Sequence, residues 1–311
     1  MLARAVVFVA PLAAGAQSAP STTLRIGVVT PRAAASAPEQ SALRGIRFGA
    51  SEAEQTARLF GSRVEVFEAS GDGRKSGALA AAAFLVSRRG VQILIGTSVA
   101  DSDSLSKFAE SRQLVFLNVA SRSGALRAAC RRYSFHVEAG DGMYAKALRL
   151  AALNRGGAAV GTEASPASGV ALWDARLERF GAGQLNDRFR TLTRQEMDGS
   201  AWAAWVAVKI AAESALRARS GEAGKIREFL EAPATQFDGH KGWPLSFRAA
   251  DHQLRQPLYI VAPHRRSAAA TAAPVDVPDV REVSSAPGHQ SAQDALDRLA
   301  AGSVRCRWGS R

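Results

Sequence analysis

The chain has 311 residues, of which 47% are hydrophobic, and a formal net charge of +12. No segment reaches the roughly 18 consecutive apolar residues of a transmembrane helix, which excludes a membrane-spanning protein. The net charge raises nucleic acid as a partner, but the 40 basic residues, 34 Arg and six Lys, are spread along the chain. No basic run is interleaved with aromatic residues, so the charge pattern argues against nucleic-acid binding.

The N-terminal residues 1–16 have the pattern of a secretory signal peptide. Arg4 precedes the apolar run Ala5–Ala14, and Ala14-Gly15-Ala16 forms a small-residue cleavage site. We therefore expect cleavage near Ala16 and export to the periplasm. A cytoplasmic chain with a frayed N-terminus is the alternative.

Strands and helices alternate through the first half of the chain. Buried or alternating apolar runs predict strands, and apolar spacing of three and four residues predicts helices. The expected strands are Leu24–Thr30, Arg63–Ala69, Val91–Gly96 and Leu114–Val119, and the expected helices are Ser41–Phe60, Ser76–Arg89 and Asp101–Arg112. Short connections between them predict an α/β fold, with a doubly wound parallel sheet in a first lobe over residues 22–137.

The second half of the chain is less regular. Tyr133–Glu138 predicts a further strand, and the expected helices are Met143–Leu153, Trp173–Phe180, Ser200–Arg219 and Lys225–Glu231. Gly239–Pro263 contains two apolar runs, LSF and LYIV, around a polar turn, which predicts a β-hairpin. Residues 138–263 are therefore expected to form a second lobe, with helices and a hairpin that return to the first lobe. Residues 264–311 are expected to form a mobile Ala/Ser/Pro-rich tail with a weak helix at Ala292–Ala300.

Two small polar loops follow buried strands, at Thr97-Ser98 and at Ala120–Gly124. In an open parallel sheet, ligands bind beyond the carboxyl ends of the strands. Neither loop contains a nucleophile with a base, and Ser98 lacks the surroundings of a hydrolase serine. The five histidines are scattered without metal-ligand spacing, and no cofactor motif is present. The loops therefore predict a site that holds a small molecule without transforming it.

Cys130 and Cys306 are the two cysteines of the chain. An isolated pair in an exported protein predicts a disulfide bond. Two unrelated thiols are the alternative. Trp202 and Trp205 lie three residues apart on an amphipathic helix, which favours a core position for both over ligand stacking.

Several stretches together resemble a known family. LRIGVVT, LRGIRFGASEA, ILIGTSVADSDSLSKFAE and LVFLNVASRSGALR are similar to the type I periplasmic solute-binding proteins, in the leucine/isoleucine/valine-binding class of ABC transporter receptors. Later pieces, among them LWDARLERFGAGQLNDRFR and DGSAWAAWVAVKIAAESAL, resemble the subgroup associated with PQQ-dependent alcohol dehydrogenase systems. The resemblance covers residues 22–263. It implies a non-enzymatic receptor that binds a small solute between two lobes and works with an ABC transporter membrane permease.

The resemblance also implies where the first lobe contacts a ligand. Those positions are occupied here by Thr97, Ser98, Ala100, Asp101, Ala120, Ser121 and Arg122. Hydroxyl groups and loop amides bind carboxylates, and an arginine pairs with a carboxylate through two hydrogen bonds. Asp101 departs from the small hydroxyl residue usual in the family. Its position at a helix start favours a capping role, with ligand contact as the alternative.

The second lobe is shorter than the resemblance implies. About twenty residues lie between Leu153 and Trp173, where the family has several tens more, and most of them are Gly, Ala or Ser. A ligand held by one lobe stays poorly buried. The chain is thus expected to be either a solute receptor or a degenerate binding-protein scaffold without high-affinity binding. The shortening itself is either natural or the result of a defective gene model.

Overall fold

The computed structural model describes residues 22–31, 36–71, 75–153, 169–261, 280–283, 291–300, 302 and 304–308. The expected signal peptide and its cleavage site lie outside these residues, as does the Gly/Ala/Ser-rich connection 154–168. Among the helices described, none combines the length and apolar character needed to cross a membrane.

A five-stranded parallel sheet forms the centre of the first lobe, with the strand order β2-β1-β3-β4-β5. The strands are β1 (Thr23–Thr30), β2 (Arg63–Ser70), β3 (Ile93–Gly96), β4 (Val115–Asn118) and β5 (Ser134–His136). Every residue of β3 and β4 is buried, as a parallel sheet covered on both faces requires. The predicted α/β fold with a doubly wound parallel sheet is confirmed.

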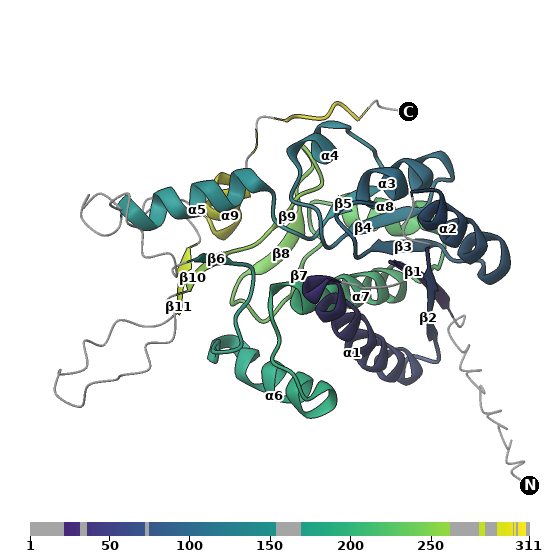
Figure 1. Ribbon diagram of the computed structural model, residues 1–311, viewed down its shortest axis with the longest axis horizontal. Coiled ribbons are helices and arrows are strands. Elements are labelled where there is room, and N and C mark those ends of the chain that lie inside the picture. The colour runs from purple at the N-terminus through teal and green to yellow at the C-terminus, as the bar shows by residue number, and fades with distance from the viewer. Residues whose placement is uncertain are drawn as a thin grey trace, which may run out of the picture.

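Helices cover both faces of this sheet (Figure 1). One face carries α2 (Lys75–Arg89) and α3 (Ser102–Ser111), which pack on an apolar cluster that includes Leu94 and Phe116. The helices on the other face are α1 (Ala37–Leu59), α7 (Gly199–Ala218) and α8 (Ala223–Glu231). The last two come from the second half of the chain, so the first lobe is completed by distant sequence.

The helices α1 and α7 pack closely because α1 has glycine at the contact. A Cβ atom on Gly45 would lie 2.1 Å from the carbonyl oxygen of Ala201, and one on Gly49 would lie 3.0 Å from that of Trp205. Trp202 and Trp205 are less than 2% exposed, so their predicted core positions are confirmed. Trp202 also stacks on Trp173, with 5.8 Å between the ring centroids.

Two small antiparallel sheets lie beyond the first lobe. One has the order β11-β10-β6, and the other has the order β7-β8-β9. Their strands are β6 (Gly169–Ala171), β10 (Leu258–Val261), β11 (Val280–Val283), β7 (Phe237–Asp238), β8 (Pro244–Phe247) and β9 (Leu254–Arg255). The helices α5 (Asp141–Leu153) and α9 (Ala292–Ala300) lie together beside the first of these sheets (Figure 1). The helix α6 (Ala182–Thr193) packs against α1.

The strand pairing differs from the hairpin expected over Gly239–Pro263. The run LSF, in β8, pairs with β9, whereas LYIV forms β10 and pairs with β6 and β11. Pro257 stands between β9 and β10 and has no amide hydrogen to extend a ladder. The expected hairpin therefore exists in a shorter form, and its second apolar run belongs to another sheet.

The prediction of a helix over Trp173–Phe180 is wrong. The backbone forms turns there, followed by a 3-10 turn at Arg179–Gly181. The carboxylate of Asp174 accepts a hydrogen bond from the amide of Arg176 at 2.9 Å, and such a turn competes with helix formation. Two helices that the sequence did not indicate, α6 and the short α4 (Gly124–Ala128), are also present.

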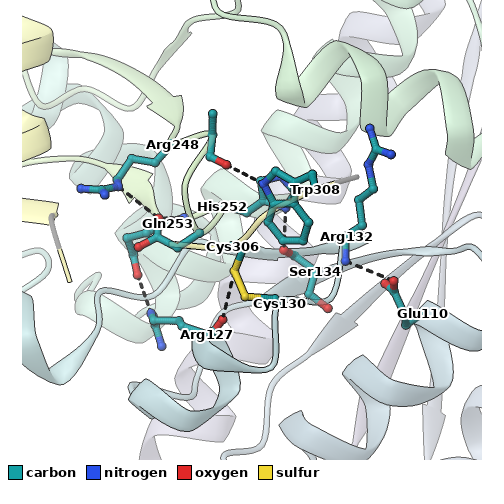
Figure 2. The surroundings of a disulfide bond; sticks show 12 residues. Glu110, Arg127, Cys130, Arg132, Ser134, Arg248, His252, Gln253, Cys306 and Trp308 are labelled. Atoms are coloured by element: carbon teal, nitrogen blue, oxygen red, sulfur yellow. Dashed lines mark hydrogen bonds and ion pairs between the residues drawn. A yellow bond between two sulfur atoms is a disulfide. The ribbon is translucent and has the colours of Figure 1, made fainter. Parts of the chain in front are cut away.

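The disulfide bond Cys130–Cys306 is confirmed, with a Cα–Cα distance of 5.3 Å. It fastens an arm, residues 304–308, to the first lobe (Figure 2). The amide of Cys306 donates to the carbonyl oxygen of Ala250 at 2.7 Å, and Trp308 lies on His252. The expected helix at Ala292–Ala300 is confirmed as α9. The described parts of the tail, which the sequence predicts to be mobile outside this helix, also include β11 and this arm, and these are held by strand pairing and by the disulfide.

Candidate functional site

The loops after β3 and β4 lie side by side because their strands are neighbours in the parallel sheet. Gly96 and Asn118, the last residues of the two strands, are paired in register. The predicted residues Thr97–Asp101 and Ala120–Arg122 therefore meet at one edge of the sheet, where ligands of open parallel sheets bind. This edge, formed by the two loops, is the candidate site.

In the first loop, some of the hydroxyl groups already bond within the protein. Thr97 is 2% exposed, and its Oγ1 donates to the carbonyl oxygen of Val29 at 3.2 Å. Ser98 is also buried, and its carbonyl oxygen accepts a hydrogen bond from the hydroxyl of Ser102 at 2.7 Å. Ala100 is exposed. The side chain of Val99 is 64% exposed and adds an apolar surface that the sequence did not single out.

Asp101 occupies the N-cap position of α3, but its side chain does not cap the helix. The carboxylate instead hydrogen-bonds Ser98. Burial raises the pKa of Asp101, and the bond to Ser98 opposes that rise. The expected capping role is therefore wrong, and Asp101 faces the loop that carries the candidate site.

The second loop is shaped by Asn118. Its Oδ1 accepts from the amide of Ser121 at 2.8 Å and from that of Ala120 at 3.3 Å, while its Nδ2 donates to the carbonyl oxygen of Ser121 at 2.7 Å. These bonds fold the chain back directly after β4, in the manner of an Asx turn. Ser121 is 3% exposed and Ala120 is half-buried, so Arg122 is the residue that projects from this loop.

Arg122 has two partners from the segment that leaves the first lobe. Its Nε lies 3.5 Å from Oε1 of Glu138, and its guanidinium lies 3.9 Å from the ring centroid of Tyr144. The Arg122 side chain is 51% exposed, whereas that of Glu138 is 6% exposed. The cation is thus accessible to a solute while its protein counter-ion is buried.

Glu138 is held in place by α5. The hydroxyl of Tyr144 donates to Oε1 of Glu138 at 2.6 Å. Burial raises the pKa of Glu138, and the hydrogen bond from Tyr144 and the charges of Arg122 and Arg127 oppose that rise. Burial and the neighbouring carboxylate also raise the pKa of Tyr144. We call Arg122, Glu138 and Tyr144 the arginine–glutamate–tyrosine cluster.

A buried arginine connects the second loop to the segment behind it. Arg127 Nη1 donates to the carbonyl oxygen of Ser123 at 3.0 Å, and its Nη2 donates to that of Glu138 at 2.6 Å. Its Nε donates to Oε1 of Gln253 at 2.7 Å. Burial lowers the pKa of Arg127 to about 10, which leaves the guanidinium charged at neutral pH.

Two connections of the chain, residues 136–140 and 253–257, lie next to each other at this point. Gln253 Nε2 donates to the carbonyl oxygen of Glu138 at 3.1 Å, and Gln256 Nε2 donates to that of Val137 at 2.7 Å. Residues 136–140 lead from β5 to α5, and residues 253–257 include β9 and lead to β10. The candidate site is therefore supported by two chain connections that hydrogen-bond each other.

Sequence reasoning missed Asn118, Arg127, Glu138, Tyr144 and Gln253. Asn118 ends a buried strand, and an amide side chain at that place is a usable signal for a turn. The other four lie in ordinary polar or amphipathic contexts, and their roles depend on partners up to 126 residues away.

The arrangement is suited to binding an anion. A half-exposed guanidinium projects from the loop that follows β4, and a guanidinium pairs with a carboxylate through two hydrogen bonds. The described residues contain no group of three or more His, Cys, Asp or Glu side chains that could hold a metal ion.

Comparisons with known proteins agree with this architecture. Residues 23–175 match a family model described as periplasmic binding protein. A comparison with curated protein sequences gives no match. Solved structures are similar at low identity. The branched-chain amino acid transporter substrate binding protein LivJ from Streptococcus pneumoniae, in complex with isoleucine, is 15% identical, with 78% of this chain and 96% of that chain covered and a TM-score of 0.63.

Two further structures extend the comparison. A branched-chain amino acid ABC transporter periplasmic ligand-binding protein from Burkholderia xenovorans is 12% identical, with 77% of this chain and 90% of that chain covered and a TM-score of 0.66. A solute-binding protein of an ABC transporter from R. palustris, in complex with benzoate, is 14% identical, with 77% and 93% covered and a TM-score of 0.63. At these identities the likeness establishes the fold. The chain therefore has the fold of the type I periplasmic binding proteins, and the match to the periplasmic binding protein family covers residues 23–175.

Proposed function

We propose that this protein is a non-enzymatic, extracytoplasmic receptor that delivers a small organic solute to the membrane permease of an ABC transporter. The solute is amino-acid-like, an amide or a carboxylate, and it binds at Thr97, Ser98, Ala100, Asp101, Ala120, Ser121 and Arg122. The observation that carries this proposal is the half-exposed guanidinium of Arg122, in the loop that follows β4 at the carboxyl edge of a parallel sheet.

The chemistry of the solute follows from the groups at this edge. A carboxylate matches Arg122 in charge and geometry. The exposed side chain of Val99 matches an apolar part of the same solute. The similar structures hold isoleucine and benzoate, and each of these ligands combines a carboxylate with an apolar group.

A ligand screen by thermal shift tests the receptor function, because a solute that binds only the native state raises the melting temperature. The panel contains isoleucine, benzoate, acetate, a primary alcohol and a primary amide. We expect a rise of several degrees with at least one carboxylate and none with the alcohol. The absence of any shift across the panel at millimolar concentration would contradict the proposal.

The second candidate function is a binding-protein scaffold that interacts with other proteins and has lost high-affinity solute binding. It is favoured by the internal partners of the site: the hydroxyl of Thr97 bonds Val29, and Arg122 already pairs with Glu138. A solute must replace these bonds, which weakens its affinity. The same thermal shift screen separates the two functions.

The proposed link to PQQ-dependent alcohol oxidation and the periplasmic location rest on the sequence resemblance. Two experiments address them separately. N-terminal sequencing of the protein purified from its native source should begin just after Ala16. The genes beside this one should encode an ABC permease, an ATPase and a quinoprotein dehydrogenase, and their absence would remove the link to alcohol oxidation.

A further inference from the structure

In the arginine–glutamate–tyrosine cluster, the negative charge of Glu138 is paired with the guanidinium of Arg122. An anion that binds this guanidinium would leave Glu138 without its counter-ion. Arg122 is the exposed member, with Glu138 buried behind it. An anion on the outer side of the guanidinium competes with Glu138 for the same cation. We infer, on the basis of the proposed function, that an anionic solute binds together with one proton, which is taken up by Glu138.

The other groups that face Glu138 do not replace Arg122 as its partner, so proton uptake is the way to neutralise the carboxylate. Tyr144, on α5, donates a neutral hydrogen bond to Oε1. Arg127, on α4, is held by Ser123, Gln253 and the backbone of Glu138. Neither of these groups moves closer to the carboxylate without breaking its own bonds, so neither replaces Arg122.

A second cation lies in the same interior, at Lys241 in the turn between β7 and β8. This lysine is fully buried, and its Nζ donates to Oε1 of Gln256 at 2.9 Å and to the carbonyl oxygen of Pro257 at 3.2 Å. Burial lowers the pKa of Lys241, which weakens it as a counter-ion, although the charge of Glu138 opposes that shift. Burial also raises the pKa of Glu138. A carboxylate in this environment that loses Arg122 favours its neutral form.

The exchange balances in charge and atoms. Before binding, Arg122 is positive, Glu138 is negative, and the solute anion and one proton are in water. After binding, Arg122 pairs with the anion and Glu138 carries the proton, so the charges of Arg122, Glu138 and the bound anion sum to zero, as those of Arg122 and Glu138 do before binding. No covalent bond to the solute forms or breaks. For one proton taken up, the affinity for an anion rises by up to about tenfold for each unit of decrease in pH.

Infrared difference spectroscopy tests the proton exchange without a ligand, because Arg122→Ala removes the same cation. We expect Arg122→Ala to show the carbonyl stretch of a protonated carboxyl group at neutral pH, and we expect Glu138→Gln in the same background to abolish that band. The matched variant Arg122→Lys keeps a cation beside Glu138 and should lack the band. An Arg122→Ala spectrum in which Glu138 stays ionised would overturn the inference.

Calorimetry with benzoate and with isoleucine then tests the coupling in the unmodified protein. Titrations in buffers of different ionisation enthalpy report the protons exchanged, and we expect uptake of about one proton per bound anion. Binding without proton uptake would overturn the coupling and leave the proposed receptor function standing. If neither probe binds while the infrared band appears in Arg122→Ala, the receptor function fails and the proton exchange between Arg122 and Glu138 stands.

Discussion

Trp308 stacks on His252, with 4.4 Å between the ring centroids and 13° between the ring planes. Phe135 stacks on the other face of His252, with 4.2 Å between centroids. The imidazole lies in the core between the first lobe and the C-terminal arm (Figure 2). Its Nδ1 lies 3.2 Å from the carbonyl oxygen of Ser134, and its Nε2 lies 3.5 Å from a carboxylate oxygen of Glu231.

We predict that Trp308→Ala raises the pKa of His252, which burial lowers to about 4 in the unmodified protein. The variant admits water to one face of the ring, so the pKa should move toward the ordinary value of about 6.5. The pH dependence of the ring proton signals in NMR measures this shift. Trp243→Ala, which removes an indole bonded to Glu282, is the control and should leave the His252 signals unchanged.

The same histidine makes stability depend on pH. The unfolded chain binds a proton at His252 below about pH 6.5, whereas the folded chain binds it only below about pH 4. Stability is therefore fully present above about pH 6.5 and is lost as the pH falls toward 4, by at most about 3 kcal/mol from this residue. Urea unfolding at several pH values should show this decline, and Trp308→Ala should make it shallower. If the free energy of unfolding falls with decreasing pH as steeply in Trp308→Ala as in the unmodified protein, the assignment to His252 is contradicted.

We predict that removing the disulfide by the double substitution Cys130→Ser and Cys306→Ser lowers the free energy of unfolding. The bond joins residues 176 apart, and a loop of that length contributes about 4–5 kcal/mol in the chain-entropy description. Thermal unfolding with and without reductant measures the effect. Reductant should lower the melting temperature of the unmodified protein and leave that of the double variant unchanged.

Gly45→Ala should destabilise the protein by about 2 kcal/mol or more, because the new Cβ atom meets the backbone of α7 at 2.1 Å and the helices must move apart. Gly142→Ala is the matched control. This second glycine also lies in a helix, α5, and an added Cβ atom there meets nothing within 4 Å. The control should be neutral or stabilising by up to about 1 kcal/mol. If chemical denaturation shows the same loss in free energy of unfolding for Gly45→Ala and Gly142→Ala, the close packing at Gly45 does not determine stability.

Arg122→Ala should weaken binding of an anionic solute by about 1.5–3 kcal/mol, the range for a charge-assisted hydrogen bond. The ion pair with buried Glu138 predicts a cost to folding as well. The variant should lose about 1–3 kcal/mol of stability at pH 8. The loss should be smaller at pH 5, because a carboxyl group whose pKa is raised in the folded state stabilises that state as it takes up its proton. Isothermal titration and urea unfolding measure the two effects separately, and wild-type affinity in the variant would refute the role of Arg122.

Asp198→Ala should cost about 1–3 kcal/mol of stability. Asp198 caps α7 by accepting from the amide of Ala201 at 2.9 Å, and it also accepts from the hydroxyl of Ser41 at 2.7 Å. The control is Asp187→Ala, which removes an exposed ion pair with Arg190 on α6 and should cost less than about 1 kcal/mol. Urea unfolding of the two variants compares them directly, and similar losses would exclude a special role of the cap.

The sequence by itself determined the features that depend on local pattern. The strands β1, β3 and β4 are largely apolar, and α7 carries inward-facing tryptophans, so burial on both sides of a parallel sheet could be inferred before any contact was known. Two cysteines permit a single intramolecular pair, and the pair formed. The loops at Thr97 and Ala120 were located because each follows the end of a buried strand.

Only the tertiary structure decided which distant groups meet. A short apolar run such as LYIV indicates burial but names no partner, and its pairing with β6 and β11 reflects where the surrounding chain places it. The same holds for Arg127 with Gln253 and for Arg122 with Glu138 and Tyr144. A polar residue that is buried must find a partner, and the identity of that partner depends on the fold because side chains far apart in sequence are brought together only when the sheets and helices have packed.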